Sequence, residues 1–291
     1  MIELAGGSAY VVDAHVHVFP EEIERDRAAW LLRDGWFNAL YQNPNARLAT
    51  TEDLIESMDR AGVDHSIVCG FPWSDDAHCA FHNEYMADAA RRFPERISWL
   101  AIVAPGDGAG KSAGECLASG AVGIGELNAD AQGFLWTEAS RLAPIAEAAQ
   151  AFDRPIMVHA SEPLGHDYPG KGRATPDQLL ALAEAFPELR IVAAHWGGGL
   201  PFFELMPEVR HLLANLAYDS AATTYLYDHA VFEHAMRICG PDKVIFASDY
   251  PVLRQDRLIA RMKETEWPSM EDARNVMGGN AARVYRLELT S

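Results

Sequence analysis

Cysteine is scarce in this chain of 291 residues, and the four that occur are far apart. They are Cys69, Cys79, Cys116 and Cys239, and no two of them form a Cys-x-x-Cys pair. Disulfide frameworks and cysteine-rich zinc sites are recognised by close, regular spacings, which this chain does not have. We therefore expect reduced cysteines that mostly pack in the core of a cytoplasmic protein, without a metal-binding or catalytic role.

Positive charge and long apolar runs are also in short supply. The chain has 24 Lys and Arg residues against 42 Asp and Glu residues, which gives a formal net charge of -18. A basic surface is needed to bind nucleic acid or anionic membranes without sequence preference, so neither partner is expected. No apolar run approaches the roughly 20 residues that cross a bilayer. The N-terminus also lacks the basic segment and apolar core of a secretory signal, which favours a cytoplasmic location.

Short apolar runs separated by segments of helical period are what the sequence does contain. Strands that alternate with helices indicate parallel pairing, and eight such units are typical of a closed (β/α)₈ barrel. We therefore predict an α/β TIM barrel that forms a single domain over residues 1–291. The eight runs are Tyr10–Asp13, Ser66–Cys69, Ile97–Val103, Ala121–Glu126, Pro155–His159, Arg190–His195, Asn215–Asp219 and Lys243–Asp249.

Some segments between the runs contain residues that are typical of helix starts. Thr50 or Thr51 is a plausible N-cap for a helix over residues 52–61, and Thr175-Pro176 is a typical helix start. A closing helix is expected over residues 270–285. A doubly wound open sheet is the alternative fold, but it would normally place a glycine-rich phosphate turn after its first strand, where this chain has histidines. The segment 19–49 is too long for a simple connection, so we expect an inserted helical pair or a lid over the site.

The first run leads into Asp13-Ala14-His15-Val16-His17. Alternate side chains of a strand point to the same side, so His15 and His17 project together and form half of a transition-metal site. The two histidines on their own could equally line a solvated surface. Asp13 is expected to support the site rather than to bind the metal.

Further metal-type ligands stand at the ends of later runs, where the strands of a barrel converge on one cavity. Each has an ordinary explanation, because a lone histidine is usually a hydrogen-bonded core or surface residue and a terminal Asp or Glu is usually a turn or loop residue. Such residues nevertheless recur at the ends of five of the predicted runs, and this recurrence predicts a metal site. The predicted ligands are His15, His17, Glu126, His159, His195 and Asp249.

Four motifs in order give the chain a resemblance to a known family. They are Asp13-Ala14-His15-Val16-His17, Val158-His159, Ala194-His195 and Ala247-Ser248-Asp249-Tyr250-Pro251. The set resembles the amidohydrolase superfamily over nearly the whole chain. It is most similar to the amidohydrolase-related branch, which contains aminocarboxymuconate semialdehyde decarboxylase, γ-resorcylate decarboxylase and pyrone-dicarboxylate lactonase.

The resemblance implies a role for each matching position. His15, His17 and His159 would bind metal, and Asp249 would bind metal and handle a proton. His195 would be a catalytic acid or base in an enzyme with one metal and a ligand of the second ion in an enzyme with two. Glu126 departs from the decarboxylases and resembles the bridging glutamate of TatD-like hydrolases.

The loop after the fifth run offers hydrogen-bond donors for an anionic substrate. Loops at this end of a barrel commonly carry specificity, so His166, Tyr168, Lys171 and Arg173 are candidate substrate-binding residues. Trp196 is a candidate for the cavity wall. The loop charges are equally well explained as solvated surface residues.

The function predicted from the sequence is a metal-dependent hydrolase of a small ester, lactone or amide that carries an anionic group. The expected metal is Zn²⁺, as one or two ions. It would activate water to hydroxide, and Asp249 would accept and return the proton. A non-oxidative decarboxylase of an unsaturated or aromatic carboxylic acid is the alternative. A TatD-like nuclease and a non-catalytic metal-binding barrel rank lower, and a homo-oligomer is left open.

Overall fold

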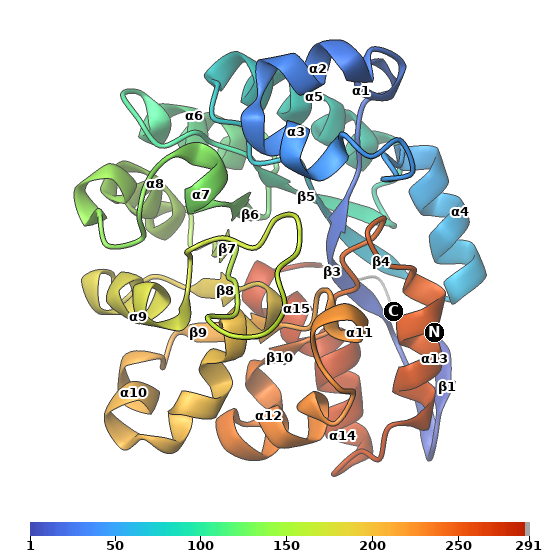
Figure 1. Cartoon of the computed structure of the whole chain (residues 1–291). Helices are drawn as coiled ribbons and strands as arrows, with labels where there is room; N and C mark the ends of the chain where they lie inside the picture. Colours follow the sequence, from blue (N-terminus) through green and yellow to red (C-terminus); the bar gives the residue numbers. More distant parts are fainter. Residues whose placement is uncertain (289–291) are drawn as a thin grey trace.

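The computed structural model describes residues 1–288 of the predicted domain, and a ring of eight parallel strands lies at its centre (Figure 1). The ring closes where Val16 forms a parallel bridge with Tyr250 and where the Ala14 N–H donates to the Phe246 carbonyl at 3.0 Å. The predicted TIM barrel is therefore confirmed, and each of the eight predicted runs overlaps one strand. The strands are β3 (Val12–His17), β4 (His65–Cys69), β5 (Ile97–Ala101), β6 (Gly123–Leu127), β7 (Ile156–Val158), β8 (Ile191–Ala193), β9 (Leu216–Asp219) and β10 (Val244–Ile245).

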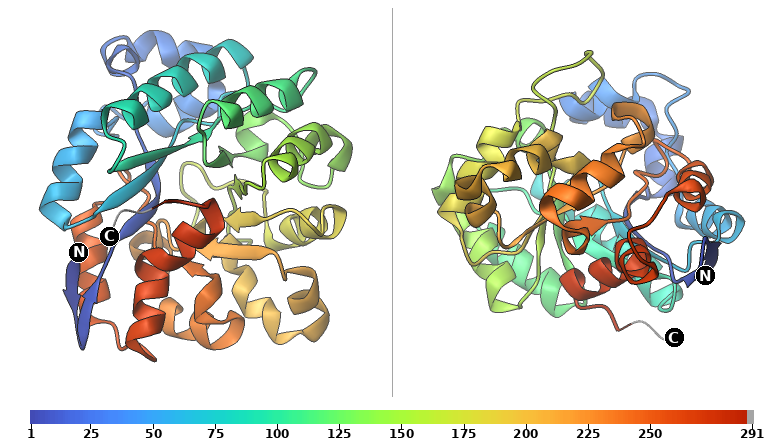
Figure 2. Two further views of the ribbon diagram at one scale, coloured as in Figure 1. Left: turned by 180° about the vertical axis from the view of Figure 1, so that it is seen from behind. Right: turned by 90° about the horizontal axis from the view of Figure 1, so that it is seen from below.

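Helices surround the strands, and Figure 2 shows this outer layer from behind and from below. The predicted caps are present, since Thr50 and Asp53 form a reciprocal capping box and Pro176 occupies the first turn of its helix. None of the helices within residues 1–288 is long and apolar enough to cross a membrane. The α-helices that follow the inserted segment, within residues 1–288, are α4 (Thr51–Ala61), α5 (Asp76–Arg92), α6 (Ala109–Ala118), α7 (Ala129–Gln132), α8 (Ala139–Ala151), α9 (Pro176–Ala185), α10 (Pro207–Leu212), α11 (Thr223–Leu226), α12 (Val231–Cys239), α13 (Gln255–Glu264), α14 (Met270–Arg274) and α15 (Asn280–Tyr285).

Three features differ from the sequence prediction. The chain begins with an antiparallel hairpin of β1 (Ile2–Leu4) and β2 (Gly7–Ala9), which lies outside the barrel and was not predicted. The predicted closing helix is α14 and α15 joined by one π-helical segment, Asn275–Gly279. The inserted segment contains three short helices rather than two: α1 (Glu21–Arg25), α2 (Arg27–Arg33) and α3 (Gly35–Tyr41).

The inserted helices are fixed over the carboxyl ends of the strands by aromatic packing. Phe37 of α3 packs on Phe71 and Trp73, which follow β4, with ring centroids 5.2 Å apart in each pair. The Asp34 carboxylate caps α3 by accepting from the backbone N–H groups of Trp36 and Phe37. These contacts place α3 at the mouth of the barrel, as expected for a cover over the site.

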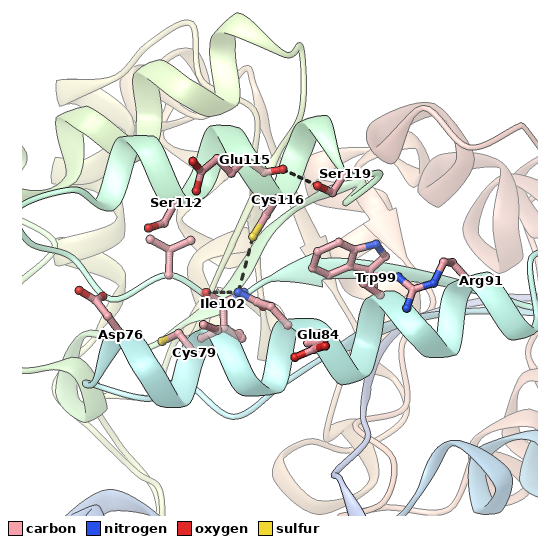
Figure 3. Close-up of a pocket in the computed structure, with 14 residues that line it drawn as sticks. Asp76, Cys79, Glu84, Arg91, Trp99, Ile102, Ser112, Glu115, Cys116 and Ser119 are labelled. Carbon is pink, nitrogen blue, oxygen red and sulfur yellow. Dashed lines mark hydrogen bonds between the residues drawn. The ribbon is translucent and has the colours of Figure 1, made fainter.

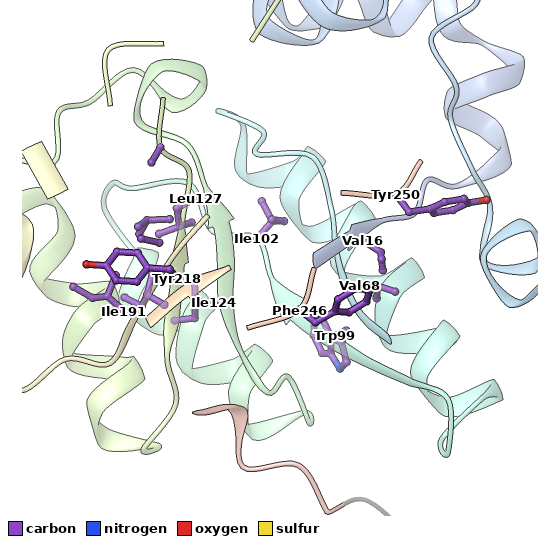
Figure 4. Close-up of a cluster of buried hydrophobic side chains, with 14 of the residues drawn as sticks. Val16, Val68, Trp99, Ile102, Ile124, Leu127, Ile191, Tyr218, Phe246 and Tyr250 are labelled. Atoms are coloured by element: carbon purple, nitrogen blue, oxygen red, sulfur yellow. The ribbon is translucent and has the colours of Figure 1, made fainter. Parts of the chain in front are cut away.

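The core has two layers, because alternate side chains of each strand point to opposite faces. Ile67 and Met157 belong to the inner cluster within the barrel. Val68, Trp99 and Phe246 belong to the outer cluster, between the strands and the helices (Figure 4). The barrel is thus filled with side chains rather than hollow.

Candidate metal centre and active site

His15 and His17 reach the inner face of β3 through an irregularity in the strand. Val12 and Ala14 point into the barrel, and the register with β4 then shifts between Asp13 and Val16. Such a bulge moves the inward direction from even to odd positions. The two histidines that follow therefore face the barrel axis, as the sequence spacing predicted.

The Nδ1 atoms of both histidines are held by acceptors. His15 Nδ1 lies 2.8 Å from Asp219 Oδ2, and His17 Nδ1 lies 3.3 Å from the Gly70 carbonyl oxygen. With each Nδ1–H donating, the two Nε2 atoms carry lone pairs, and these atoms are only 3.1 Å apart. Two facing lone pairs repel each other unless a cation lies between them. This arrangement fits a metal ion bound by both Nε2 atoms.

Two carboxylates complete the cluster of ligand atoms. Glu126 Oε2 lies 3.6 Å from His15 Nε2 and 3.8 Å from His17 Nε2. Asp249 Oδ1 lies 3.9 Å and 3.5 Å from the same two nitrogens. Ligands that surround one ion at about 2.0–2.2 Å are separated by roughly 3–3.6 Å. Each carboxylate oxygen is therefore within a few tenths of an ångström of the separation at which it could share one divalent ion with the two histidine nitrogens.

The second oxygen of Glu126 faces the other two histidines. Glu126 Oε1 lies 2.9 Å from His159 Nδ1 and 3.3 Å from His195 Nε2. Gly125 makes this placement possible, because a Cβ there would lie 2.5 Å from the Met157 carbonyl oxygen and φ is +138°. The structure thus places His15 and His17 beside one oxygen of Glu126 and His159 and His195 beside the other, while Asp249 faces the same two nitrogens of the histidine pair.

The electrostatics of the histidine pair favour a bound cation. Burial by itself would lower the pKa of His15, but interaction with Cys69 and Asp219 raises it well above 6.5. Burial opposes the charge of His17 as well, yet Cys69 and Asp249 raise its pKa to about 10. The anions therefore draw positive charge to these nitrogens, and a divalent ion supplies that charge when it displaces the protons.

His195 and Asp249 share a backbone conformation that is unusual for residues with side chains. Their φ angles are +56° and +67°, in the left-handed region. Their backbones are held there by hydrogen bonds from His195 N to Asp219 Oδ1 at 2.9 Å and from Asp249 N to the His15 carbonyl at 3.0 Å. Strain of this kind clusters at functional sites, where the surrounding structure fixes the side chain.

A cavity of about 450 Å³ connects this cluster with the exterior. His17, Glu126, His159, His195 and Asp249 form its base. Its walls are largely aromatic and include Trp36, Tyr41, Phe71, Tyr168 and Tyr225.

Arg47 is the one Arg or Lys side chain among the described residues that line this cavity. Its guanidinium is 3.1 Å from Asp53 Oδ1 and lies over the Tyr250 ring, 5.4 Å from the ring centroid. The cavity therefore offers a metal-type cluster, aromatic walls and a single cation.

The predicted substrate-binding residues are distributed unevenly about the cavity. Tyr168 lines it, and His166 packs on Tyr168 with ring centroids 5.6 Å apart. Lys171, which donates to two loop carbonyls, and Arg173, which pairs with Asp130 on the surface, are outside its lining. Trp196 is also outside the lining. It is fully buried, and its indole N–H donates to Thr223 Oγ1 at 2.8 Å.

Three residues of the site were missed by sequence reasoning. Asp219, which holds His15, ends the seventh predicted run and could have been found from the same strand-end position as the other ligands. Cys69 Sγ lies 3.6 Å from His17 Nδ1, although its strand-end position was read as core packing. Arg47 lies in the inserted segment, and nothing in the sequence singles it out.

Asp13 has the expected supporting role, since its carboxylate accepts a hydrogen bond from the Ser248 hydroxyl at 2.6 Å.

A second cavity, of about 360 Å³, lies between α5 and α6 outside the barrel (Figure 3). Its lining contains Cys79 and Cys116 but no histidine. Burial raises the pKa of both thiols, and a protonated thiol is a poor metal ligand and nucleophile. These two cysteines agree with the structural role expected for them, and the candidate active site is the cavity at the barrel mouth.

The family model described as Amidohydrolase (Amidohydro_2) matches residues 12–287. The chain belongs to this amidohydrolase family. No curated protein sequence matches it.

Several solved structures share the fold of this family member. The 5-carboxyvanillate decarboxylase of Sphingomonas paucimobilis has a TM-score of 0.81 at 20% identity, and the match covers 96% of this chain and 100% of that one. The 5-carboxyvanillate decarboxylase of Novosphingobium aromaticivorans, in complex with manganese and 4-hydroxy-3-methoxy-5-nitrobenzoic acid, has a TM-score of 0.78 at 19% identity, covering 96% and 97%. The 2,6-dihydroxybenzoate decarboxylase of Rhizobium has a TM-score of 0.74 at 18% identity, covering 97% and 100%. At these identities the likeness shows the shared fold.

The prediction of a hydrolase is wrong. The structural neighbours are mostly decarboxylases of aromatic acids, which agrees with the alternative stated from the sequence. The prediction depended on reading Glu126 as a bridge between two ions. In the structure one oxygen of Glu126 faces the His15–His17 pair and the other lies 2.9 Å from His159 Nδ1 and 3.3 Å from His195 Nε2. Zinc is likewise unconfirmed, since the metal named with a neighbour is manganese.

Proposed function

We propose that the protein is a divalent-metal-dependent, non-oxidative decarboxylase of an aromatic carboxylic acid. The observation that carries the proposal is the cavity at the barrel mouth. It joins a cluster of metal-type ligands to aromatic walls and to one guanidinium, that of Arg47. A flat ring with an anionic group matches these features in size and chemistry. The decarboxylase activity of structural neighbours supports the same choice.

We propose that His15, His17, Glu126 and Asp249 hold one ion per chain. The two carboxylates of the set suit Mn²⁺, the metal named with one structural neighbour, and the two imidazoles make Zn²⁺ the second candidate. When bound, the ion supplies Lewis acidity that draws electron density from the oxygens of the substrate. His159 remains a predicted ligand, and in the structure its Nδ1 contacts Glu126.

The aromatic walls and Arg47 would position the substrate. Trp36 and Tyr41 of α3 and Phe71 after β4 line the cavity. Stacking and edge contacts with such side chains hold an aromatic ring in a defined orientation. Arg47 would bind an anionic substituent on the part of the ring that points away from the histidine cluster, since a guanidinium pairs well with a carboxylate.

Decarboxylation requires a proton donor close to the reacting carbon. The bond between the ring carbon and the carboxyl carbon breaks, CO₂ leaves, and the electron pair stays on the ring carbon, which then takes a proton. Burial opposes a charge on His195, but the hydrogen bond to Glu126 and the charge of Asp249 raise its pKa to about 9. His195 lines the cavity beside the predicted metal ligands, and we assign the donated proton to its Nε2.

Asp249 has the complementary role. Burial alone would raise its pKa, but the contact with His17 and the charge of His195 lower it below its usual value. An ionised Asp249 would help to hold the metal and would stabilise the imidazolium of His195 until the proton is transferred. Solvent then restores the proton to His195 after the products leave.

A panel of hydroxylated benzoic acids, incubated with the manganese-loaded protein, tests the proposal. We expect release of CO₂, and in D₂O the product carries deuterium at the carbon that lost the carboxyl group. The variant His17→Ala should abolish the release, whereas His211→Ala, on the exposed surface of α10, should leave it unchanged. Turnover of esters or lactones without CO₂ release from any acid would refute the proposal.

A further inference from the structure

Cys69 stands beside the histidine pair on the neighbouring strand. β3 and β4 are adjacent parallel strands (Figure 1), and His17 and Cys69 are partners in their register. Cys69 belongs to the inner cluster of the barrel and is fully buried. Its thiol is thus directed to the same side of the sheet as the histidines, and Cys69 is not among the residues that line the cavity.

The distances are those of a site for a metal with a preference for sulfur. Cys69 Sγ lies 3.6 Å from His17 Nδ1 and 4.0 Å from His17 Nε2. One ligand atom from each of His15, His17 and Cys69 lies within 4.8 Å of the other two. In tetrahedral zinc sites, Zn–S bonds of about 2.3 Å and Zn–N bonds of about 2.0–2.1 Å place nitrogen and sulfur roughly 3.5 Å apart. The distances from Sγ to the two His17 nitrogens are thus within about half an ångström of that separation.

The contact that the thiol makes in the structure is weak, since its S–H group donates to the Val16 carbonyl at 3.4 Å. Little is lost when that contact is exchanged for a bond to a metal.

We propose that Cys69, His15 and His17 form a second ion position, which binds Zn²⁺ or Cd²⁺. Thiolate ligands select such ions, whereas Mn²⁺ prefers the carboxylate oxygens of Glu126 and Asp249. Both positions use His15 and His17, so one ion excludes the other. As the metal–sulfur bond forms, the thiol proton is released to solvent.

With two overlapping positions, the identity of the metal determines which ligands hold it. A zinc ion drawn to Cys69 is moved away from Glu126 and Asp249, the carboxylates next to His195. The inference shares the metal centre of the proposed function, but it concerns ligation alone and is tested without any turnover measurement. Its failure would leave the decarboxylase proposal standing, and failure of the decarboxylase proposal would leave the zinc–sulfur bond to be measured.

X-ray absorption at the metal edge of the loaded full-length protein tests the proposal. With zinc, we expect one sulfur scatterer at about 2.3 Å in the wild type. With manganese, we expect nitrogen and oxygen scatterers only. A zinc spectrum of the wild type without sulfur would overturn the proposal, and this result needs no variant.

Competition between Zn²⁺ and Mn²⁺ gives a second readout. Cys69→Ser should lose the sulfur scatterer and should reduce the preference for zinc over manganese by at least about tenfold, which is about 1.4 kcal/mol. Cys79→Ser, in the cavity outside the barrel, should change neither quantity. Cys69→Ala serves in the same experiment should the serine variant fail to fold, as judged by circular dichroism. An unchanged zinc preference in a folded Cys69 variant would also contradict the proposal.

Discussion

The imidazole of His15 is held by Asp219, whose Oδ2 lies 2.8 Å from His15 Nδ1, and both side chains are fully buried. The other oxygen of Asp219 accepts from the backbone N–H groups of His195 at 2.9 Å and Ala221 at 3.0 Å. One carboxylate on β9 therefore orients a ligand on β3 and fixes the start of the loop that carries His195. Partners of this kind set the tautomer and basicity of a metal-binding histidine.

Replacement of Asp219 should weaken metal binding without removing a ligand. Asp219→Asn keeps the shape of the side chain but loses the charge that holds the His15 Nδ1–H. We expect the affinity for Mn²⁺ to fall by roughly 10- to 100-fold, as for other partners of metal-binding histidines. Competition with a chelating dye measures the change, with Asp177→Asn on α9 as the matched control. An unchanged affinity would show that Asp219 is not a positioning residue for His15.

Arg47 should determine how tightly an anionic substrate binds. Hydrogen bonds to charged groups contribute about 1.5–3 kcal/mol, so Arg47→Gln should lower kcat/KM for a dicarboxylated aromatic acid by roughly 10- to 100-fold. We expect the change mainly as an increase in KM, because Arg47 would bind the substrate, whereas the proton is assigned to His195. Arg173→Gln is the matched control. Arg173 was predicted from the sequence, but it pairs with Asp130 on the surface, so its replacement should have little effect. Equal losses in both variants would refute the role of Arg47.

His82 should make the free energy of unfolding depend on pH in the acid range. Burial lowers its pKa to about 4, and the neutral ring accepts from the Trp73 indole N–H at 3.0 Å while its Nε2–H donates to the Val18 carbonyl at 2.7 Å. Between pH 6.5 and 4 the unfolded chain binds a proton at this histidine and the folded chain does not. Stability therefore falls as the pH falls through this range and is fully present above it.

Denaturant unfolding of the wild type and His82→Gln at several pH values measures this contribution. The wild type should lose on the order of 3 kcal/mol more than the variant between pH 7 and pH 4. The difference between the two proteins isolates His82 from the other titrating groups. Parallel stability curves would mean that His82 does not titrate differently in the folded and unfolded chains.

The positions of the strands could be predicted from the sequence because burial on both faces leaves continuous apolar runs. The same reasoning predicted that His15, His17 and Asp249 lie close together, as they do in the structure, since polar residues at strand ends converge in a parallel barrel. Their role as metal ligands stays a prediction. Arg47 could not be found in this way, because its place at the cavity depends on how the inserted helices pack on Phe71 and Trp73. The role of Glu126 also depended on geometry, since a sequence does not show that its two oxygens face different histidines.

The most direct test of the account follows the carboxyl group of a hydroxybenzoic acid labelled with ¹³C at that carbon. The metal-stripped protein should release no labelled CO₂, and addition of Mn²⁺ should restore release until one ion is bound per chain. His15→Ala should release none at any manganese concentration. Labelled CO₂ release that persists without metal, or the absence of release from every aromatic acid at full manganese occupancy, would contradict the account.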